Sequence, residues 1–157
     1  MDESFDFDLN GRRVSVQAEP GQSLLDVLRN TLGLRATRMG CGQGQCGACR
    51  VMVDGHAIAS CETPMWSVQG KRVTTVEGLG RRDAPHPLQR AFIEEQAMQC
   101  GFCTSGILIS AAALLQRQPC PDRAAIVQAL DPHLCRCGAH NRVLRAIEKT
   151  IEREAAR

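Results

Sequence analysis

Cysteine is the residue type in this chain whose number and spacing could do chemistry. There are nine cysteines among 157 residues, and cysteines in such numbers form disulfides, zinc sites or iron–sulfur clusters. Eight of them fall into two groups of four, Cys41, Cys46, Cys49 and Cys61, followed by Cys100, Cys103, Cys135 and Cys137. The N-terminal segment is acidic and alternating, unlike a secretory signal, so we expect a cytoplasmic chain with reduced thiols that ligate metal.

The first group has the spacing C-x4-C-x2-C-x11-C. A C-x4-C-x2-C run followed by one later cysteine is the plant-type spacing for a [2Fe–2S] cluster. The loop between these cysteines is rich in glycine, which lets the backbone curl closely and turn its N–H groups toward the sulfurs. Zinc is the alternative, but it favours two C-x2-C-like pairs. We therefore predict a plant-type [2Fe–2S] site here.

The second group has the spacing C-x2-C-x31-C-x-C on a helical background. The spacing alone leaves zinc and [2Fe–2S] as equal alternatives. Both close pairs are expected at helix termini, where free N–H groups favour thiolates and a negatively charged cluster.

The other reactive side chains form no catalytic set. Cys120 lies between two prolines and is interpreted as an incidental thiol. His133 and His140 flank the last cysteine pair and are interpreted as ordinary polar residues, because eight cysteines already complete two sites. A G-x-G-x-x-G match at 42–47 is interleaved with cysteines and precedes a strand, which excludes a dinucleotide-binding turn. We expect no catalytic residues on this chain.

The elements that position the first group are mostly strands. Alternating residues at 4–9, the turn Asn10-Gly11 and a second alternating run at 14–16 predict a hairpin. Ser23, ahead of an apolar run, predicts a helix that ends at Gly33. Further strands are predicted at 50–53, 56–59 and 73–76.

The second half is predicted to be helical. Glycine, proline and charge cluster at 77–87, which marks a boundary. Four helices are predicted beyond it, at 87–97, 105–115, 122–130 and 142–153. The sequence thus predicts an α+β protein with two domains, 1–78 and 79–157.

Charge and hydropathy exclude several classes of partner. The 19 basic and 17 acidic residues give a net charge of +2, and aromatic residues are scarce, so we expect no nucleic-acid partner. No run approaches the ~18 apolar residues of a transmembrane helix.

The cysteine motifs together resemble a known family. The run GCGQGQCGAC at 40–49, with Ser60-Cys61, resembles the N-terminal ferredoxin-like domain of the xanthine oxidase family. The runs QCGFCT at 99–104 and LCRCG at 134–138 resemble the C-terminal helical domain of that family. The resemblance implies a β-grasp plant-type ferredoxin domain followed by a four-helix [2Fe–2S]-binding domain, with [2Fe–2S] clusters in both sites.

The same resemblance implies the small electron-transfer subunit of a molybdenum hydroxylase. Its large partner subunit would hold molybdopterin, in the cytosine dinucleotide form, and Gln99 and Cys137 would approach it. Electrons would pass from molybdenum to the second cluster, then to the first, and leave to an FAD-binding or cytochrome c subunit. The substrate of the whole enzyme would be an N-heterocycle or an aldehyde. A redox-sensing regulator, a free-standing ferredoxin and a structural zinc protein are the alternative functions.

Overall fold

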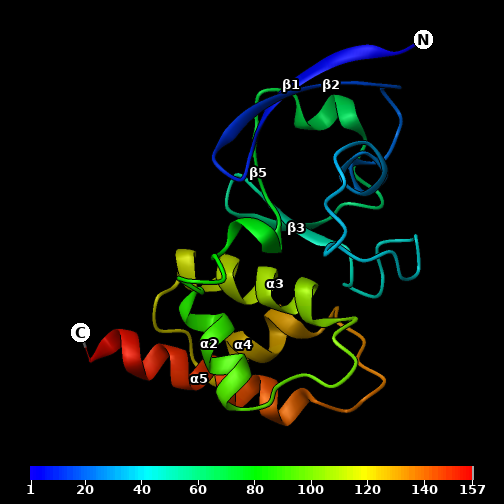
Figure 1. Cartoon of the computed structure of the whole chain (residues 1–157). Coiled ribbons are helices and arrows are strands. Elements are labelled where there is room, and N and C mark those ends of the chain that lie inside the picture. Colours follow the sequence, from blue (N-terminus) through cyan, green and yellow to red (C-terminus); the bar gives the residue numbers. More distant parts are fainter. Residues whose placement is uncertain (157) are drawn as a thin grey trace.

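The computed structural model describes residues 1–156 of the chain, and its first half is built on a five-stranded mixed sheet (Figure 1). Strands β1 (Glu3–Leu9) and β2 (Arg12–Ala18) form the predicted antiparallel hairpin. Both turn residues, Asn10 and Gly11, have positive φ, as this type of tight hairpin turn requires.

The remaining strands complete the sheet in the order β2-β1-β5-β3-β4. Strand β5 (Arg72–Thr74) runs parallel to β1, and β3 (Arg50–Val53) pairs antiparallel with both β5 and β4 (His56–Ala59). The strand was predicted at 73–76, but β5 ends at Thr74. Thr75 instead exchanges two hydrogen bonds of 2.8 and 3.0 Å with the Asn10 side chain, and Val76–Gly78 forms a 3₁₀ turn (η3).

The helix predicted after Ser23 begins where expected, but only its first turn is α-helical. In α1 (Leu24–Asp26), the Ser23 hydroxyl accepts the Asp26 N–H at 3.2 Å. The chain continues as a wider π-helical segment, η1 (Val27–Thr31), which the N–H of Leu32 closes onto the Val27 carbonyl. A second short turn, η2 (Met65–Val68), had no signal in the sequence.

Four α-helices follow residue 86, so the described chain contains five α-helices and belongs to the α+β class. They are α2 (Pro87–Glu94), α3 (Thr104–Arg117), α4 (Arg123–Leu130) and α5 (His140–Ala155). The predicted first helix, to 97, is too long. The chain turns at Gln96, which has positive φ, and the N–H of Ala97 bonds the Phe92 carbonyl at 2.8 Å in a Schellman motif.

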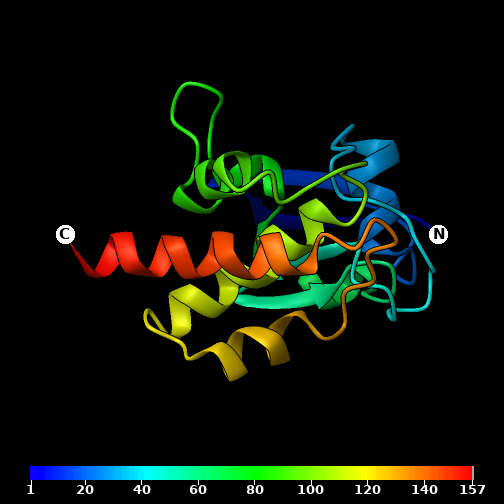
Figure 2. The same cartoon turned by 90° about the horizontal axis from the view of Figure 1, so that it is seen from below.

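Strand β3 divides the apolar residues into two cores. Val51 and Val53 pack with the hairpin and α1, whereas Met52 points the other way and packs with α2 to α5. Helix α3 is buried along most of its length and lies against β3. Figures 1 and 2 both show the loops at 39–49, 97–103 and 131–139, in cyan, yellow-green and orange, on the same side of the molecule. No helix among residues 1–156 has the length and hydropathy of a membrane span.

Candidate iron–sulfur sites

The first cysteine loop turns its backbone N–H groups inward, toward its own sulfurs. The Cys41 Sγ accepts three N–H groups at 3.3–3.4 Å. The Cys46 Sγ accepts the Cys41 N–H, and the Cys61 Sγ accepts the Gly44 N–H, both at 3.3 Å. Gly44 reaches this position with a φ of 67°, in the left-handed region that glycine tolerates. Donors aimed at sulfur are the arrangement that stabilises thiolates and tunes a bound iron–sulfur cluster.

The cysteines of the first set differ in how readily they ionise. The Gln43 N–H, followed by that of Cys46, lowers the pKa of Cys41 to about 7. Burial, followed by the hydrogen bond with Cys49, raises the pKa of Cys61 to about 11. A partly buried thiol of this kind gives up its proton readily only when a cation balances the charge of the thiolate. The set therefore suits an iron centre that compensates four thiolates.

The second set is assembled from two loops, each leading into a helix. Cys103 is the N-cap of α3 and Cys100 lies just before it, while Cys135 and Cys137 lie in the loop before α5. Thiols of the two loops lie close enough to influence each other's pKa, Cys100 with Cys137 and Cys103 with Cys135. The structure thus brings the four predicted residues together, at helix N-termini where negative charge is stabilised.

Ionisation in the second set follows the same pattern. The Phe102 N–H lowers the pKa of Cys100, whereas burial raises the pKa of Cys103 to about 12. Burial also acts to raise the pKa of Cys135, but the N–H of Ala139 and other donors outweigh it, so that pKa is lowered. Both sets therefore offer the donors and the partly ionised thiols that a [2Fe–2S] cluster needs.

Gln99 lies next to the second set. Its Nε2 donates to the Cys137 carbonyl at 3.2 Å, and the side chain is exposed. The two residues predicted to approach a pterin are thus adjacent to each other and reachable from outside this chain.

The two cysteine sets face each other across a cavity of about 320 Å³. It is lined from the first loop by Gly40, Cys41, Cys46 and Ala48, and from the second site by Cys100, Phe102, Cys103, Leu134, Cys135 and Arg136. The N–H of Leu134 donates to the carbonyl of Cys46 at 3.1 Å, which joins the two loops directly. Cys46 belongs to the first set, and Leu134 is the neighbour of Cys135 in the second set. This hydrogen bond therefore connects the backbones that carry the two sets.

His133 was interpreted from the sequence as an ordinary polar residue, and its structural position is unusual. It is 4% exposed, and its Nε2 lies 2.7 Å from the Ser110 Oγ on α3. Burial, followed by the nearby Arg50 charge, lowers the pKa of His133 to about 4, so the ring is neutral near pH 7. In the sequence, only its position directly before the LCRCG motif indicates a role for His133.

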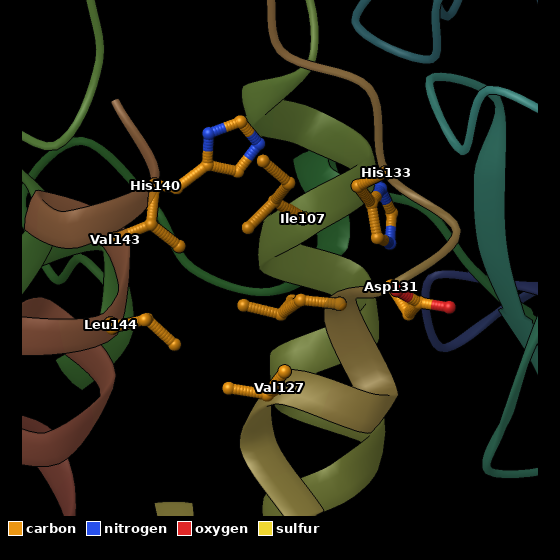
Figure 3. Close-up of a pocket in the computed structure, with 8 residues that line it drawn as sticks. Ile107, Val127, Asp131, His133, His140, Val143 and Leu144 are labelled. Atoms are coloured by element: carbon orange, nitrogen blue, oxygen red, sulfur yellow. The ribbon is translucent and has the colours of Figure 1, made fainter. Parts of the chain in front are cut away.

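A second cavity is lined by His133 together with residues of α3, α4 and α5. It has a volume of about 210 Å³ and is mostly apolar. Figure 3 shows Val127, Val143 and Leu144 pointing into it from α4 and α5, with His140 at its upper end. None of its lining residues is a cysteine, so it is separate from the two candidate metal sites.

Comparison with known proteins covers both halves. Residues 7–75 match the family described as "2Fe-2S iron-sulfur cluster binding domain", and residues 75–148 match the "[2Fe-2S] binding domain" family. The chain is 47% identical to one subunit of nicotinate dehydrogenase from Pseudomonas putida, over 97% of both chains. It is 48% identical to the alpha chain of isoquinoline 1-oxidoreductase from Brevundimonas diminuta, over 96% of this chain and 99% of the relative.

Solved structures show the same similarity in three dimensions. Quinoline 2-oxidoreductase from Pseudomonas putida superposes with a TM-score of 0.92 at 34% identity, over 99% of this chain and 96% of the other. The aldehyde oxidoreductase from Desulfovibrio desulfuricans superposes with a TM-score of 0.94 at 38% identity, where this chain corresponds to 17% of a longer polypeptide.

Proposed function

The chain belongs to the small iron–sulfur subunits of the xanthine oxidase family of molybdenum hydroxylases, and from this premise we propose how it relays electrons within such an enzyme. It is the electron-transfer subunit of the enzyme and carries no catalytic residues of its own. A [2Fe–2S] cluster stores one electron at a time, so two clusters in series divide a two-electron oxidation into single steps.

The observation that carries this proposal is that the two cysteine sets lie next to each other, on loops that line one cavity. Cys41, Cys46, Cys49 and Cys61 would hold the outer [2Fe–2S] cluster, and Cys100, Cys103, Cys135 and Cys137 would hold the inner one. The hydrogen bond between Leu134 and Cys46 joins the segments that carry these ligands. A chain built only to bind structural metal has no need of such a link between its two sites.

The finer architecture belongs to the same proposal. Residues 1–78 form a β-grasp domain of the plant-type ferredoxin kind, and residues 79–157 form a four-helix [2Fe–2S]-binding domain. The sheet order, the two cores divided by β3 and the family matches that meet at residue 75 support this division.

The partner is a large subunit that holds molybdopterin, in the cytosine dinucleotide form. Gln99 and Cys137 face that cofactor, because the exposed Gln99 amide is bonded to the Cys137 carbonyl at the surface of the inner site. Electrons enter at the inner cluster, pass to the outer one and leave to an FAD-binding or cytochrome c subunit. The complex works in the cytoplasm.

The substrate of the complete enzyme is an N-heterocycle or an aldehyde. This choice rests on the relatives, whose names give nicotinate, isoquinoline, nicotine and aldehyde as the compounds they act on. The substrate is selected in the large subunit, so nothing on this chain distinguishes among these compounds.

Electron paramagnetic resonance of the dithionite-reduced complex, with iron and spin quantification, tests the proposal. We expect two distinct spin-half signals, each integrating to about one spin per chain. A single signal together with bound zinc would contradict the relay, because the helical half would then be a structural zinc domain.

A further inference from the structure

His133 lies where the chain passes from α4 to the inner cysteine pair. Its N–H donates to the Leu130 carbonyl at 2.9 Å, at the end of α4, and its Nε2 is anchored to the Ser110 Oγ at 2.7 Å. Both His133 and Ser110 are buried, with exposures of 4% and 6%. His133 is therefore held by two elements, its backbone by the end of α4 and its ring by α3.

The face of the His133 ring lies against Gly47, in the outer cysteine loop. A Cβ on Gly47 would lie 2.4 Å from the His133 Nδ1 and 2.8 and 2.9 Å from two ring carbons. The other side of Gly47 is also confined, because a Cβ on Gly106 of α3 would lie 2.1 Å from the Gly47 carbonyl oxygen. The outer loop is thus clamped between the His133 ring and the start of α3.

Two successive residues of the inner loop therefore contact two successive residues of the outer loop. The His133 ring packs on Gly47, and the Leu134 N–H donates to the Cys46 carbonyl. The next residue, Cys135, belongs to the inner set. A shift of the His133 ring would consequently move the donor of the hydrogen bond that joins the two sites.

The hydrogen bonding of the imidazole indicates that the ring positions its neighbours by packing. Within residues 1–156, the His133 Nδ1 is buried without a hydrogen-bond partner, as are the Arg50 Nε and the Ser105 Oγ. Leaving a buried polar atom unpaired costs about 1–3 kcal/mol. Among the described residues, only one of the two ring nitrogens has a hydrogen-bond partner, and a buried unsatisfied group of this kind calls for a structural or functional reason.

We propose that His133 is a positioning residue for electron transfer between the two clusters. Fixed to Ser110, it holds the outer loop at Gly47 and keeps the bond from Leu134 to Cys46 closed, which sets the separation and orientation of the two sites. This inference rests on the proposed relay function. A core histidine that only adds stability is the competing explanation.

The test compares variants of this chain in the purified complex with its large partner. His133→Ala removes the ring, Ser110→Ala removes its anchor, and His133→Gln keeps a polar group near the place of Nε2. His140→Ala is the matched control, because His140 also flanks the last cysteine pair but is exposed. Spin–spin splitting between the two reduced clusters reports their geometry. Rapid-freeze resonance spectra after mixing with reduced methyl viologen follow how electrons spread between them.

We expect His133→Ala and Ser110→Ala to retain both signals, to change the splitting and to slow the spread of electrons between the clusters severalfold. His140→Ala should behave like the wild type, and His133→Gln, which can keep the bond to Ser110 but lacks the ring on Gly47, should fall between the wild type and His133→Ala. Wild-type splitting and rate in His133→Ala would overturn the proposal; if that variant does not fold, the same result in Ser110→Ala would do so. Absence of a second [2Fe–2S] signal in the wild-type complex would instead contradict the relay itself.

Discussion

At the scale of single residues, each site combines an accessible thiol with a more enclosed one. Cys41 and Cys100 are exposed and have lowered pKa values because backbone N–H groups point at their sulfurs. Cys61 and Cys103 are partly buried and have raised pKa values because burial disfavours the thiolate. Ligation by iron must therefore displace protons from the enclosed thiols, and every member of a set is needed to hold the cluster.

Replacing Cys137 by Ser should affect one cluster and leave the other in place. We expect the inner-cluster signal to be lost and turnover of the complex to stop, because a hydroxyl is a poor substitute for thiolate, while the outer-cluster signal remains. Resonance spectra and steady-state turnover with a dye acceptor measure the two effects. Normal turnover would contradict the proposed electron path.

Cys120→Ser is the control for that experiment. Cys120 is exposed and belongs to neither set, so the variant should show both signals at full intensity.

At the scale of elements, helix ends do much of the positioning. Cys103 occupies the N-cap position of α3, and the inner pair lies just before α5. Helix α2, which packs on α5, begins with a capping box in which His86 Nδ1 accepts the Leu88 N–H at 3.2 Å and the Gln89 Oε1 accepts the His86 N–H at 2.9 Å. An imidazole can cap in this way only when it is neutral.

The cap at His86 should make stability depend on pH. Burial, with a contribution from Arg90 and against one from Glu154, lowers the pKa of His86 below its ordinary value of 6.5. Between the two values the unfolded chain binds more protons than the folded one, so stability should fall as the pH falls below about 6.5. Urea unfolding followed by far-UV circular dichroism from about pH 7.5 to 5.5 measures this slope.

His86→Asn is the matched variant, because Asn caps helices well and does not titrate. Its slope should be shallower than that of the wild type, although His133 contributes a slope of the same sign in both proteins. Equal slopes would show that the His86 cap is not the titrating element.

At the scale of the whole molecule, the two halves are joined by close contact between backbones. Helix α3 lies against β3, and at Gly106 it approaches the carbonyl of Gly47 so closely that no side chain fits between them. The relative position of the two cysteine sets therefore depends on how α3 seats on the outer loop.

Gly106→Ala should disturb both the fold and the sites. Its Cβ would lie 2.1 Å from a backbone oxygen, so α3 or the loop must move, and we expect a loss of about 2 kcal/mol or more in the free energy of unfolding. Both cluster signals should change shape. Chemical denaturation and resonance spectra measure the two effects, and an unchanged protein would contradict the close packing described here.

Gly21→Ala is the comparison for that change. No atom of the part of the chain that the structure describes lies within 4 Å of the place that a Cβ on Gly21 would take, and its φ is ordinary, so the stability of this variant should stay within about 0.5 kcal/mol of the wild type.

Local patterns predicted most of the elements, because they depend on neighbouring residues. The Asn10-Gly11 hairpin, β3, β4 and the α+β class were confirmed. The ends of the elements were predicted less accurately than their positions. The end of α2 depends on the backbone at Gln96, and the end of β5 depends on the Asn10 side chain, which comes from a distant part of the chain.

The sequence by itself determined the kind of chemistry. Cysteine spacing and glycine content are local features of the chain, so the eight candidate ligands and their division into two sets could be read from the residues alone, although spacing alone left zinc and [2Fe–2S] open for the second set. Only the tertiary structure decided how the sets meet. The contacts of His133 with Gly47 and Ser110, and of Leu134 with Cys46, join segments far apart in the chain. They exist because α3 packs on β3, and no local pattern encodes that packing.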